Sequence, residues 1–207
     1  MNQATLFPDE PEQPRKSARN VYSTLGASNH STRERADADL YCTHPSAVER
    51  LLKLETFSHK VWEPCCGLGH ISGVLEQNGH EVRKTDIISR RDDIETLDFL
   101  SSSNCQEWDG DIITNPPYSH ATPIIYKALS LLKEGQKLAM WLRILFLESQ
   151  ERKKLFTNYP PLFVYISSKR IPCAMYGDFQ NFSQSAQGYA WFVWEKGFNG
   201  STILKWF

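Results

Sequence analysis

The stretch Trp62-Glu63-Pro64-Cys65-Cys66-Gly67-Leu68-Gly69-His70-Ile71 lies between a predicted strand, residues 59–63, and a predicted helix, residues 71–78. Two glycines after a strand allow a sharp turn and a close approach of the backbone to a ligand, because glycine has no Cβ. In an open α/β sheet, ligands bind at such strand-to-helix junctions. The same two glycines also fit an ordinary strand-to-helix turn, so this stretch needs support from elsewhere in the sequence.

A second predicted strand, residues 80–87, brings a carboxylate toward the same edge of the sheet. Asp86 follows Gly69 by seventeen residues, a position from which a carboxylate can accept hydrogen bonds from ribose hydroxyls. A loop that binds a pyrophosphate would need a third glycine where Ser72 stands. Glu63 would repel a pyrophosphate and suits a cofactor that carries sulfonium and ammonium cations. The pattern therefore predicts a positively charged nucleoside cofactor.

Strand and helix patterns alternate along the rest of the chain. Such alternation predicts an α/β fold with a mostly parallel sheet and helices on both faces. A long irregular loop, residues 171–188, is expected to be functional and is a possible target-recognition element. The predicted helices are 45–55, 71–78, 121–133 and 147–156, and the predicted strands are 59–63, 80–87, 111–114, 137–142, 162–167 and 189–194.

Length and composition indicate one cytosolic domain. The 207 residues suffice for a single α/β core, which we place at 39–207, and the polar segment 1–38 is expected to be a flexible tail or arm. No apolar stretch is long enough for a membrane span, and the N-terminus does not resemble a secretion signal. The five cysteines, with Cys65 and Cys66 adjacent, form no Cys-x-x-Cys pair. We therefore expect reduced thiols and no bound metal.

The motif Asn115-Pro116-Pro117-Tyr118 follows the predicted strand 111–114. Two prolines make a stiff loop, and an amide or exocyclic nitrogen needs such positioning because its lone pair is delocalised. The Asn115 side-chain oxygen and the Pro116 carbonyl could accept hydrogen bonds from an NH₂ group and direct its lone pair toward an electrophile. Tyr118 could stack on a flipped base. A surface turn that binds a peptide-recognition domain is the alternative.

Charge is distributed unevenly around this motif. Residues 61–120 contain eleven Asp and Glu against four Lys and Arg, whereas residues 121–170 contain nine Lys and Arg against three Glu. The second segment, with Arg152-Lys153-Lys154 and Lys169-Arg170, suits a polyanion, and aromatic residues of the 171–188 loop suit unstacked bases. Two solvated faces of opposite charge would explain the same pattern.

The combined motifs resemble the N6-adenine DNA methyltransferases, particularly the short phage- and prophage-type enzymes, over roughly residues 22–207. Tyr41-Cys42-Thr43-His44-Pro45 is similar to the Tyr-x-Thr-Pro segment of that family, which helps to hold the methionine end of its cofactor, although His44 is inserted here. Asp98-Phe99 resembles the element that contacts the cofactor's adenine. The resemblance implies a Rossmann-like class I methyltransferase with a mostly parallel seven-stranded sheet.

The resemblance also implies S-adenosylmethionine as the cofactor and DNA as the partner, with N6 of a flipped adenine as the methylated atom. Methylation of RNA adenine or of protein glutamine is a second hypothesis, because those enzymes share the tetrapeptide. A cofactor-binding regulatory subunit without catalysis is a third. The predicted catalytic residues are Asn115, Pro116, Pro117 and Tyr118. The predicted cofactor-binding residues are Tyr41, Thr43, Glu63, Pro64, Cys65, Gly67, Gly69, Asp86, Asp98 and Phe99.

Overall fold

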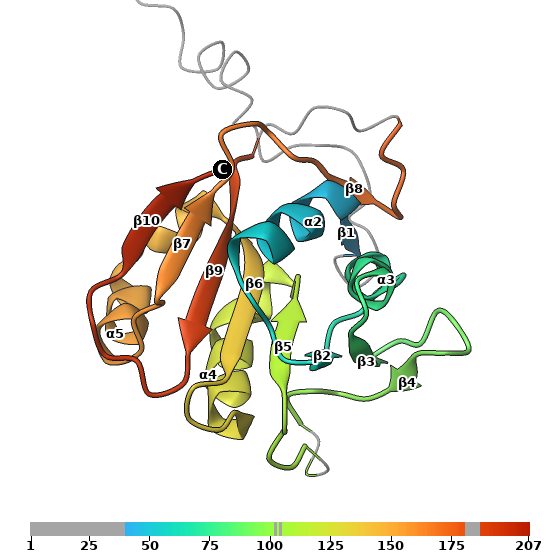
Figure 1. Ribbon diagram of the computed structural model, residues 1–207, viewed down its shortest axis with the longest axis horizontal. Coiled ribbons are helices and arrows are strands. Elements are labelled where there is room, and N and C mark those ends of the chain that lie inside the picture. The colour runs from blue at the N-terminus through green and yellow to red at the C-terminus, as the bar shows by residue number, and fades with distance from the viewer. Residues whose placement is uncertain (1–39, 102, 104, 181–186) are drawn as a thin grey trace, which may run out of the picture. The chain divides into compact units, whose positions relative to one another are not determined.

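A computed structural model of the chain describes residues 40–101, 103, 105–180 and 187–207. Its main feature is a sheet with the strand order β10-β7-β9-β6-β5-β2-β3-β4 (Figure 1). β9 runs antiparallel to both neighbours, and the other pairs are parallel. The strands are β2 (Lys60–Glu63), β3 (Glu81–Asp86), β4 (Glu95–Thr96), β5 (Asp111–Thr114), β6 (Lys137–Arg143), β7 (Phe163–Ile166), β9 (Tyr189–Glu195) and β10 (Ile203–Trp206).

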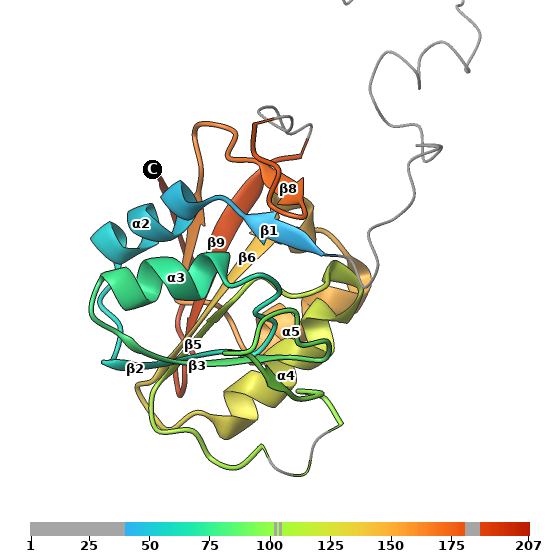
Figure 2. The same ribbon diagram turned by 90° about the vertical axis from the view of Figure 1, so that its right-hand side faces the viewer.

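Helices cover both faces of this sheet, as predicted. α2 and α3 pack on one face and α4 on the other (Figure 2). Side chains along β6 alternate between the two cores, because successive residues of a strand point to opposite faces. Leu138 and Met140 join the core under α4 and α5, whereas Ala139 and Trp141 join the core under α2 and α3. The helices are α2 (Pro45–Leu54), α3 (His70–Gln77), α4 (Ala121–Leu131) and α5 (Gln150–Asn158).

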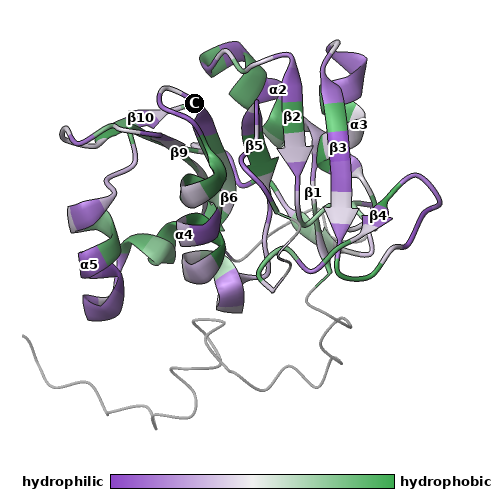
Figure 3. Cartoon of the chain, turned by 90° about the horizontal axis from the view of Figure 1, so that it is seen from below, coloured by the Kyte–Doolittle hydropathy of each residue, from purple (hydrophilic) through white to green (hydrophobic). Residues whose placement is uncertain are grey.

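Hydrophobicity explains which strands the sequence pattern revealed. Figure 3 shows hydrophobic residues concentrated in central β5, whereas α5 is largely hydrophilic. The sheet has eight strands, one more than the seven that the family resemblance implied. The additional strand is β10, which pairs with β7 at one edge of the sheet. All four β10 residues are exposed, so the strand has no alternation of apolar and polar positions for a pattern to detect. Helix α5 begins at Gln150, after a 3₁₀ turn at Ile144–Leu147 and a cap by the Ser149 side chain, later than the predicted 147.

A second, two-stranded sheet corrects the prediction for the 171–188 loop. β1 (Tyr41–Thr43) pairs antiparallel with β8 (Cys173–Met175), so part of that segment is regular. We call this pair the β1–β8 ribbon. After β8, Phe179 places its ring against the imidazoles of His44 and His70, with centroid separations of 4.8 and 5.4 Å. These edge-to-face contacts hold the segment after β8 over the start of α3.

Two expectations concern residues that the structure does not describe. The predicted tail or arm, residues 1–38, lies outside the described residues, as do residues 181–186 of the predicted loop. Within the described part of the chain, no helix is long and apolar enough to cross a membrane. Across the same residues, no group of three or more His, Cys, Asp or Glu side chains could hold a metal ion.

Candidate active site

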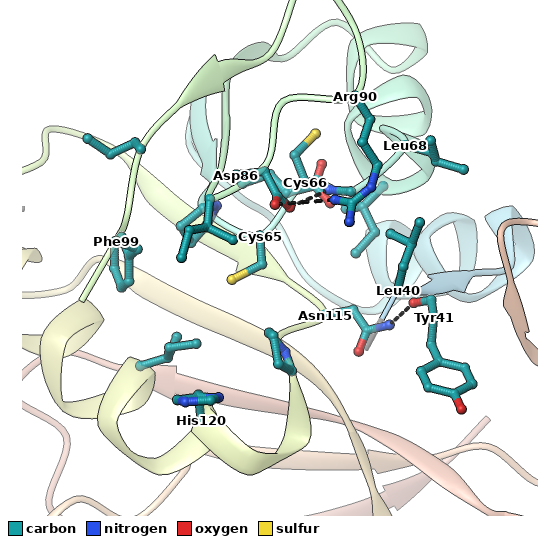
Figure 4. Close-up of a pocket in the computed structure, with 18 of the residues that line it drawn as sticks. Leu40, Tyr41, Cys65, Cys66, Leu68, Asp86, Arg90, Phe99, Asn115 and His120 are labelled. Carbon is teal, nitrogen blue, oxygen red and sulfur yellow. Dashed lines mark hydrogen bonds and ion pairs between the residues drawn. The ribbon is translucent and has the colours of Figure 1, made fainter. Parts of the chain in front are cut away.

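A pocket lies where β2, β3 and β5 reach their carboxyl ends (Figure 4). Its volume is about 620 Å³, within the range of about 300–1,000 Å³ that is common for small-ligand sites. Eleven of the fourteen predicted site residues line it, and Gly69, Pro116 and Tyr118 do not. The eleven are Tyr41, Thr43, Glu63, Pro64, Cys65, Gly67, Asp86, Asp98, Phe99, Asn115 and Pro117.

The glycine loop follows β2 and forms one wall of the pocket. Gly67 has φ +57°, a conformation that L side chains rarely adopt, and a Cβ there would lie 2.9 Å from Cδ1 of Leu40. Its N–H donates to Oδ2 of Asp86 at 2.7 Å, which ties the loop to the end of β3. Gly69, with φ +81°, precedes the first residue of α3 and supports the turn from outside the pocket. The glycines therefore shape a cradle whose space a side chain would fill.

Asp86 is the acceptor around which this loop is organised. Besides Gly67, its carboxylate accepts from the N–H of Ile88 at 3.0 Å, and Oδ1 lies 3.6 Å from Nη1 of Arg90. A carboxylate has about four lone-pair sites, so these contacts leave it able to accept from a ligand hydroxyl. Arg90 also lines the pocket and was missed in the sequence. Its position four residues after Asp86 is the feature of the sequence that could have identified it as a neighbour of this carboxylate.

Glu63 is a buried carboxyl group at the end of β2. Its side chain is 1% exposed, and Oε2 accepts the N–H of Ser72 at 2.8 Å. Burial raises the pKa of Glu63 from its ordinary value of 4.5 to about 8, and hydrogen bonds from Cys66 and Ser72 lower it only in part. The carboxyl is therefore protonated in the free protein at neutral pH. A ligand cation beside it would favour the charged form.

We expect Glu63→Gln to change how stability depends on pH. Because the folded-state pKa is raised, the contribution of Glu63 to stability is full below pH 4.5 and is lost as the pH rises to about 8. Each unit of that shift corresponds to about 1.4 kcal/mol. The free energy of unfolding of wild type should therefore fall by about a few kcal/mol relative to that of Glu63→Gln across this pH range. Urea unfolding between pH 4.5 and 9 measures the difference.

The control for this experiment is Glu81→Gln, because Glu81 is exposed at the start of the neighbouring strand β3. Its unfolding free energy should run parallel to that of wild type at every pH. Parallel profiles for wild type and Glu63→Gln would contradict the assignment of a raised pKa to the buried carboxyl.

Asp98 and Phe99 reach the pocket from the segment after β4. Oδ1 of Asp98 accepts from the N–H groups of Leu100 and Ser101 at 3.0 and 3.2 Å, and the hydrogen bonds from Ser101 are the main cause of its lowered pKa. The Phe99 ring is 4% exposed and lies edge-on against Trp62 at 5.2 Å. A charged acceptor thus lies beside an aromatic side chain, an arrangement that suits a base with an amino group.

The cysteines around the pocket behave as packing groups. Burial raises the pKa of Cys42 to about 11 and that of Cys65 to about 12, and it raises the pKa of Cys66 further still. All three are therefore thiols at neutral pH, and a thiol is a poor nucleophile.

Asn115 follows the last residue of β5, and β1 fixes the orientation of its side chain. Nδ2 donates to the backbone carbonyl of Tyr41 at 2.9 Å (Figure 4). A carbonyl oxygen can only accept, so the NH₂ end of the carboxamide must face Tyr41. Oδ1 is then left buried without a hydrogen-bond partner among the described residues, and so is Oγ1 of Thr43 in the same pocket. Each such atom costs about 1–3 kcal/mol when it stays unpaired. A ligand that donates to them would recover this cost.

Tyr118 does not line the pocket, and its contacts are with Cys173, Tyr189 and Arg143. Its hydroxyl donates to Sγ of Cys173 at 3.9 Å, and its ring centroid is 6.2 Å from that of Tyr189. The guanidinium carbon of Arg143 lies 4.6 Å from the Tyr118 ring centroid. The predicted stacking surface is therefore present, but a cation covers it in this structure. Pro116 is buried beside it, and Pro117 faces the pocket.

Comparison with known proteins establishes the fold. No protein-family model matches the sequence, and no curated protein matches it significantly. A candidate class I S-adenosylmethionine-dependent methyltransferase from Listeria monocytogenes superposes with a TM-score of 0.56 at 10% identity, over 90% of this chain and 72% of that one. The fold is that of the class I methyltransferases. A candidate RNA methyltransferase from Pyrococcus horikoshii gives a TM-score of 0.53 at 13% identity, over 86% and 98% of the two chains.

The class I methyltransferase fold of this chain accounts for the position of its pocket. In an open, mostly parallel sheet, ligands bind outside the carboxyl ends of the strands, and β2, β3 and β5 all end there. The similarity at 10–13% identity concerns this architecture. What the site binds and which atom it modifies depend on the side chains described above.

Proposed function

We propose that this protein is an S-adenosylmethionine-dependent methyltransferase that methylates N6 of adenine in DNA. The observation that carries the proposal is the carboxamide of Asn115. Its NH₂ end is held by the Tyr41 carbonyl, its buried oxygen has no partner among the described residues, and the residue lines a pocket at the edge where this fold binds ligands. An acceptor fixed in this way suits a substrate that presents an amino group.

The pocket fits the cofactor in charge and shape. Glu63 and Asp86 are buried acidic groups for its ammonium and ribose ends, and the unpartnered hydroxyl of Thr43 is a further contact for its methionine portion. Asp98 and Phe99 offer a carboxylate and an aromatic edge for its adenine. When bound, S-adenosylmethionine supplies an electrophilic methyl group on a cationic sulfur.

The role of Asn115 is to prepare the nitrogen that attacks this methyl. A hydrogen bond from the NH₂ group to Oδ1 withdraws the nitrogen from conjugation with its ring and directs its lone pair. The rigid carboxamide needs no reorganisation, because Tyr41 already holds it in place. A strong base is unnecessary, because the methylated nitrogen becomes a cation that releases its proton readily.

A nucleic acid is the class of substrate that the surface charge favours. Lys153 and Lys154 are exposed on α5, and Lys169 is exposed beyond the carboxyl end of β7, on the edge that holds the site. Arg152, which was grouped with these lysines in the sequence, instead binds the carbonyls of the preceding turn, with its Nε 2.8 Å from the oxygen of Phe146. The three lysines remain candidates for phosphate contacts.

A transfer experiment distinguishes the possible substrates. The protein, supplied with methyl-labelled S-adenosylmethionine, should label unmethylated DNA more strongly than an RNA of the same sequence or a mixture of proteins rich in glutamine. Predominant label in RNA or protein would replace DNA with that polymer and leave the chemistry of Asn115 in place. Cofactor binding without transfer to any polymer would support a regulatory subunit and contradict the proposal.

A further inference from the structure

Arg143 lies over the ring of Tyr118, and neither residue lines the cofactor pocket. It is the last residue of β6, at the carboxyl edge of the sheet, and is paired there with Tyr189 of β9. Its guanidinium carbon lies 4.6 Å from the centre of the Tyr118 ring. Asn115 and Pro117 line the pocket and Tyr118 follows them directly, so a base stacked on Tyr118 would lie next to the cofactor site.

Within the described part of the chain, no acidic side chain compensates the positive charge of Arg143. Nε is buried without a hydrogen-bond partner, and none of the described carboxylates forms an ion pair with the guanidinium. Its neighbours are neutral, because burial raises the pKa of Tyr189 to about 12 and holds those of Tyr118 and Cys173 above their usual values. The Tyr189 hydroxyl shares a hydrogen bond with the Arg143 side chain but carries no charge. A half-buried guanidinium with a spare Nε donor and no counterion among the described residues is suited to receiving an anion.

Other arginines of the chain show what a satisfied guanidinium looks like. Arg152 donates to the carbonyls of Leu145, Phe146 and Glu148. Arg83 lies over the Trp62 ring at 4.4 Å but also pairs with Glu95 at 3.0 Å. Arg83 therefore matches Arg143 in stacking on an aromatic ring and differs in having its counterion.

We propose that Arg143 exchanges the Tyr118 ring for a phosphate of the substrate strand when the target base stacks on Tyr118. This inference rests on the proposed nucleic-acid substrate. A cation over an aromatic ring and a base stacked on the same ring stabilise the structure to a similar degree. The exchange on the ring is therefore nearly balanced, and the charge-assisted pair with the phosphate favours the bound state.

Binding measured as a function of salt tests this proposal. The logarithm of the binding constant falls with the logarithm of salt concentration by about 0.7–0.9 for each phosphate that the protein neutralises. For a short DNA oligonucleotide containing adenine, measured with S-adenosylhomocysteine present, Arg143→Met should make this slope shallower by that amount. Arg143→Lys should keep the slope, because it keeps the charge, while binding more weakly than wild type. Arg83→Met, the matched control, should leave both unchanged.

A second comparison tests the exchange itself. An oligonucleotide with an abasic site in place of its single adenine cannot displace Arg143, so wild type should bind it with the shallower slope of Arg143→Met. Calorimetric titration with S-adenosylhomocysteine shows that each variant is folded and has an intact pocket. If wild-type binding depends on salt but Arg143→Met has the same slope of binding constant against salt concentration, the role of Arg143 is overturned. Wild-type binding without any dependence on salt overturns the nucleic-acid substrate, and the inference fails with it.

Discussion

Asn115→Ala should lower the kcat of methyl transfer by about 100- to 1,000-fold, the effect of removing one preorganised hydrogen-bonding group from an active site. The substitution removes the acceptor Oδ1 and the contact with the Tyr41 carbonyl at 2.9 Å. Affinity for S-adenosylhomocysteine should change by less than about threefold, because the acidic groups of the cofactor site remain. Single-turnover transfer with saturating cofactor measures the effect on chemistry.

Two further variants make this result specific. Asn115→Asp keeps acceptor oxygens but has no donor for the Tyr41 carbonyl, so the side chain loses its fixed orientation and activity should fall nearly as far. Asn78→Ala is the matched control, because Nδ2 of Asn78 also donates to a backbone carbonyl, that of Val74, at 2.8 Å and away from the pocket. Wild-type kcat in Asn115→Ala would refute the role given to the carboxamide.

Asp86→Ala should weaken the binding of S-adenosylhomocysteine by at least about tenfold, and by up to about a hundredfold if ligand hydroxyls bind this carboxylate directly. The variant leaves the buried N–H of Gly67 without its acceptor and removes the partner of Arg90. The glycine loop should lose its fixed shape, and the unfolding free energy should fall by about 1–3 kcal/mol. Calorimetry and urea unfolding measure the two effects.

Asp93→Ala is the control for Asp86→Ala. Asp93 belongs to the same segment and pairs with Lys84 and Arg91, but its side chain is 42% exposed and does not line the pocket. Its loss should leave cofactor affinity unchanged. Equal affinities in wild type and Asp86→Ala would show that the carboxylate neither binds the cofactor nor shapes the loop that does.

The predictable part of this fold consists of elements with a buried face. Residues 111–114 were predicted as a strand with its observed bounds, because β5 is buried throughout and two prolines follow one residue after its end. The short strands β1 and β8 were missed, since three residues carry too little periodicity and their pairing joins segments more than a hundred residues apart. That pairing is what brings the Tyr41 carbonyl to Asn115.

The site was predictable in its residues and less so in their orientations. Strand ends identified seven of the eleven pocket residues, because the carboxyl ends of parallel strands meet at one edge. The other four, Tyr41, Thr43, Asp98 and Phe99, came from the family resemblance. The orientation of Tyr118 depends on its contacts with Tyr189 and Cys173, which are distant from it in sequence. Arg143 carries no motif, and its role follows only from the ring that it covers.

Identifying the methylated atom is the sharpest test of whether this protein transfers a methyl group to N6 of adenine in DNA. DNA should be incubated with the protein and methyl-labelled S-adenosylmethionine, digested to nucleosides and separated against standards, with Asn115→Ala run in parallel. We expect label in N6-methyldeoxyadenosine from wild type and at least about a hundredfold less from Asn115→Ala. Label on a carbon or oxygen atom, or equal amounts of N6-methyldeoxyadenosine from both proteins, would contradict it.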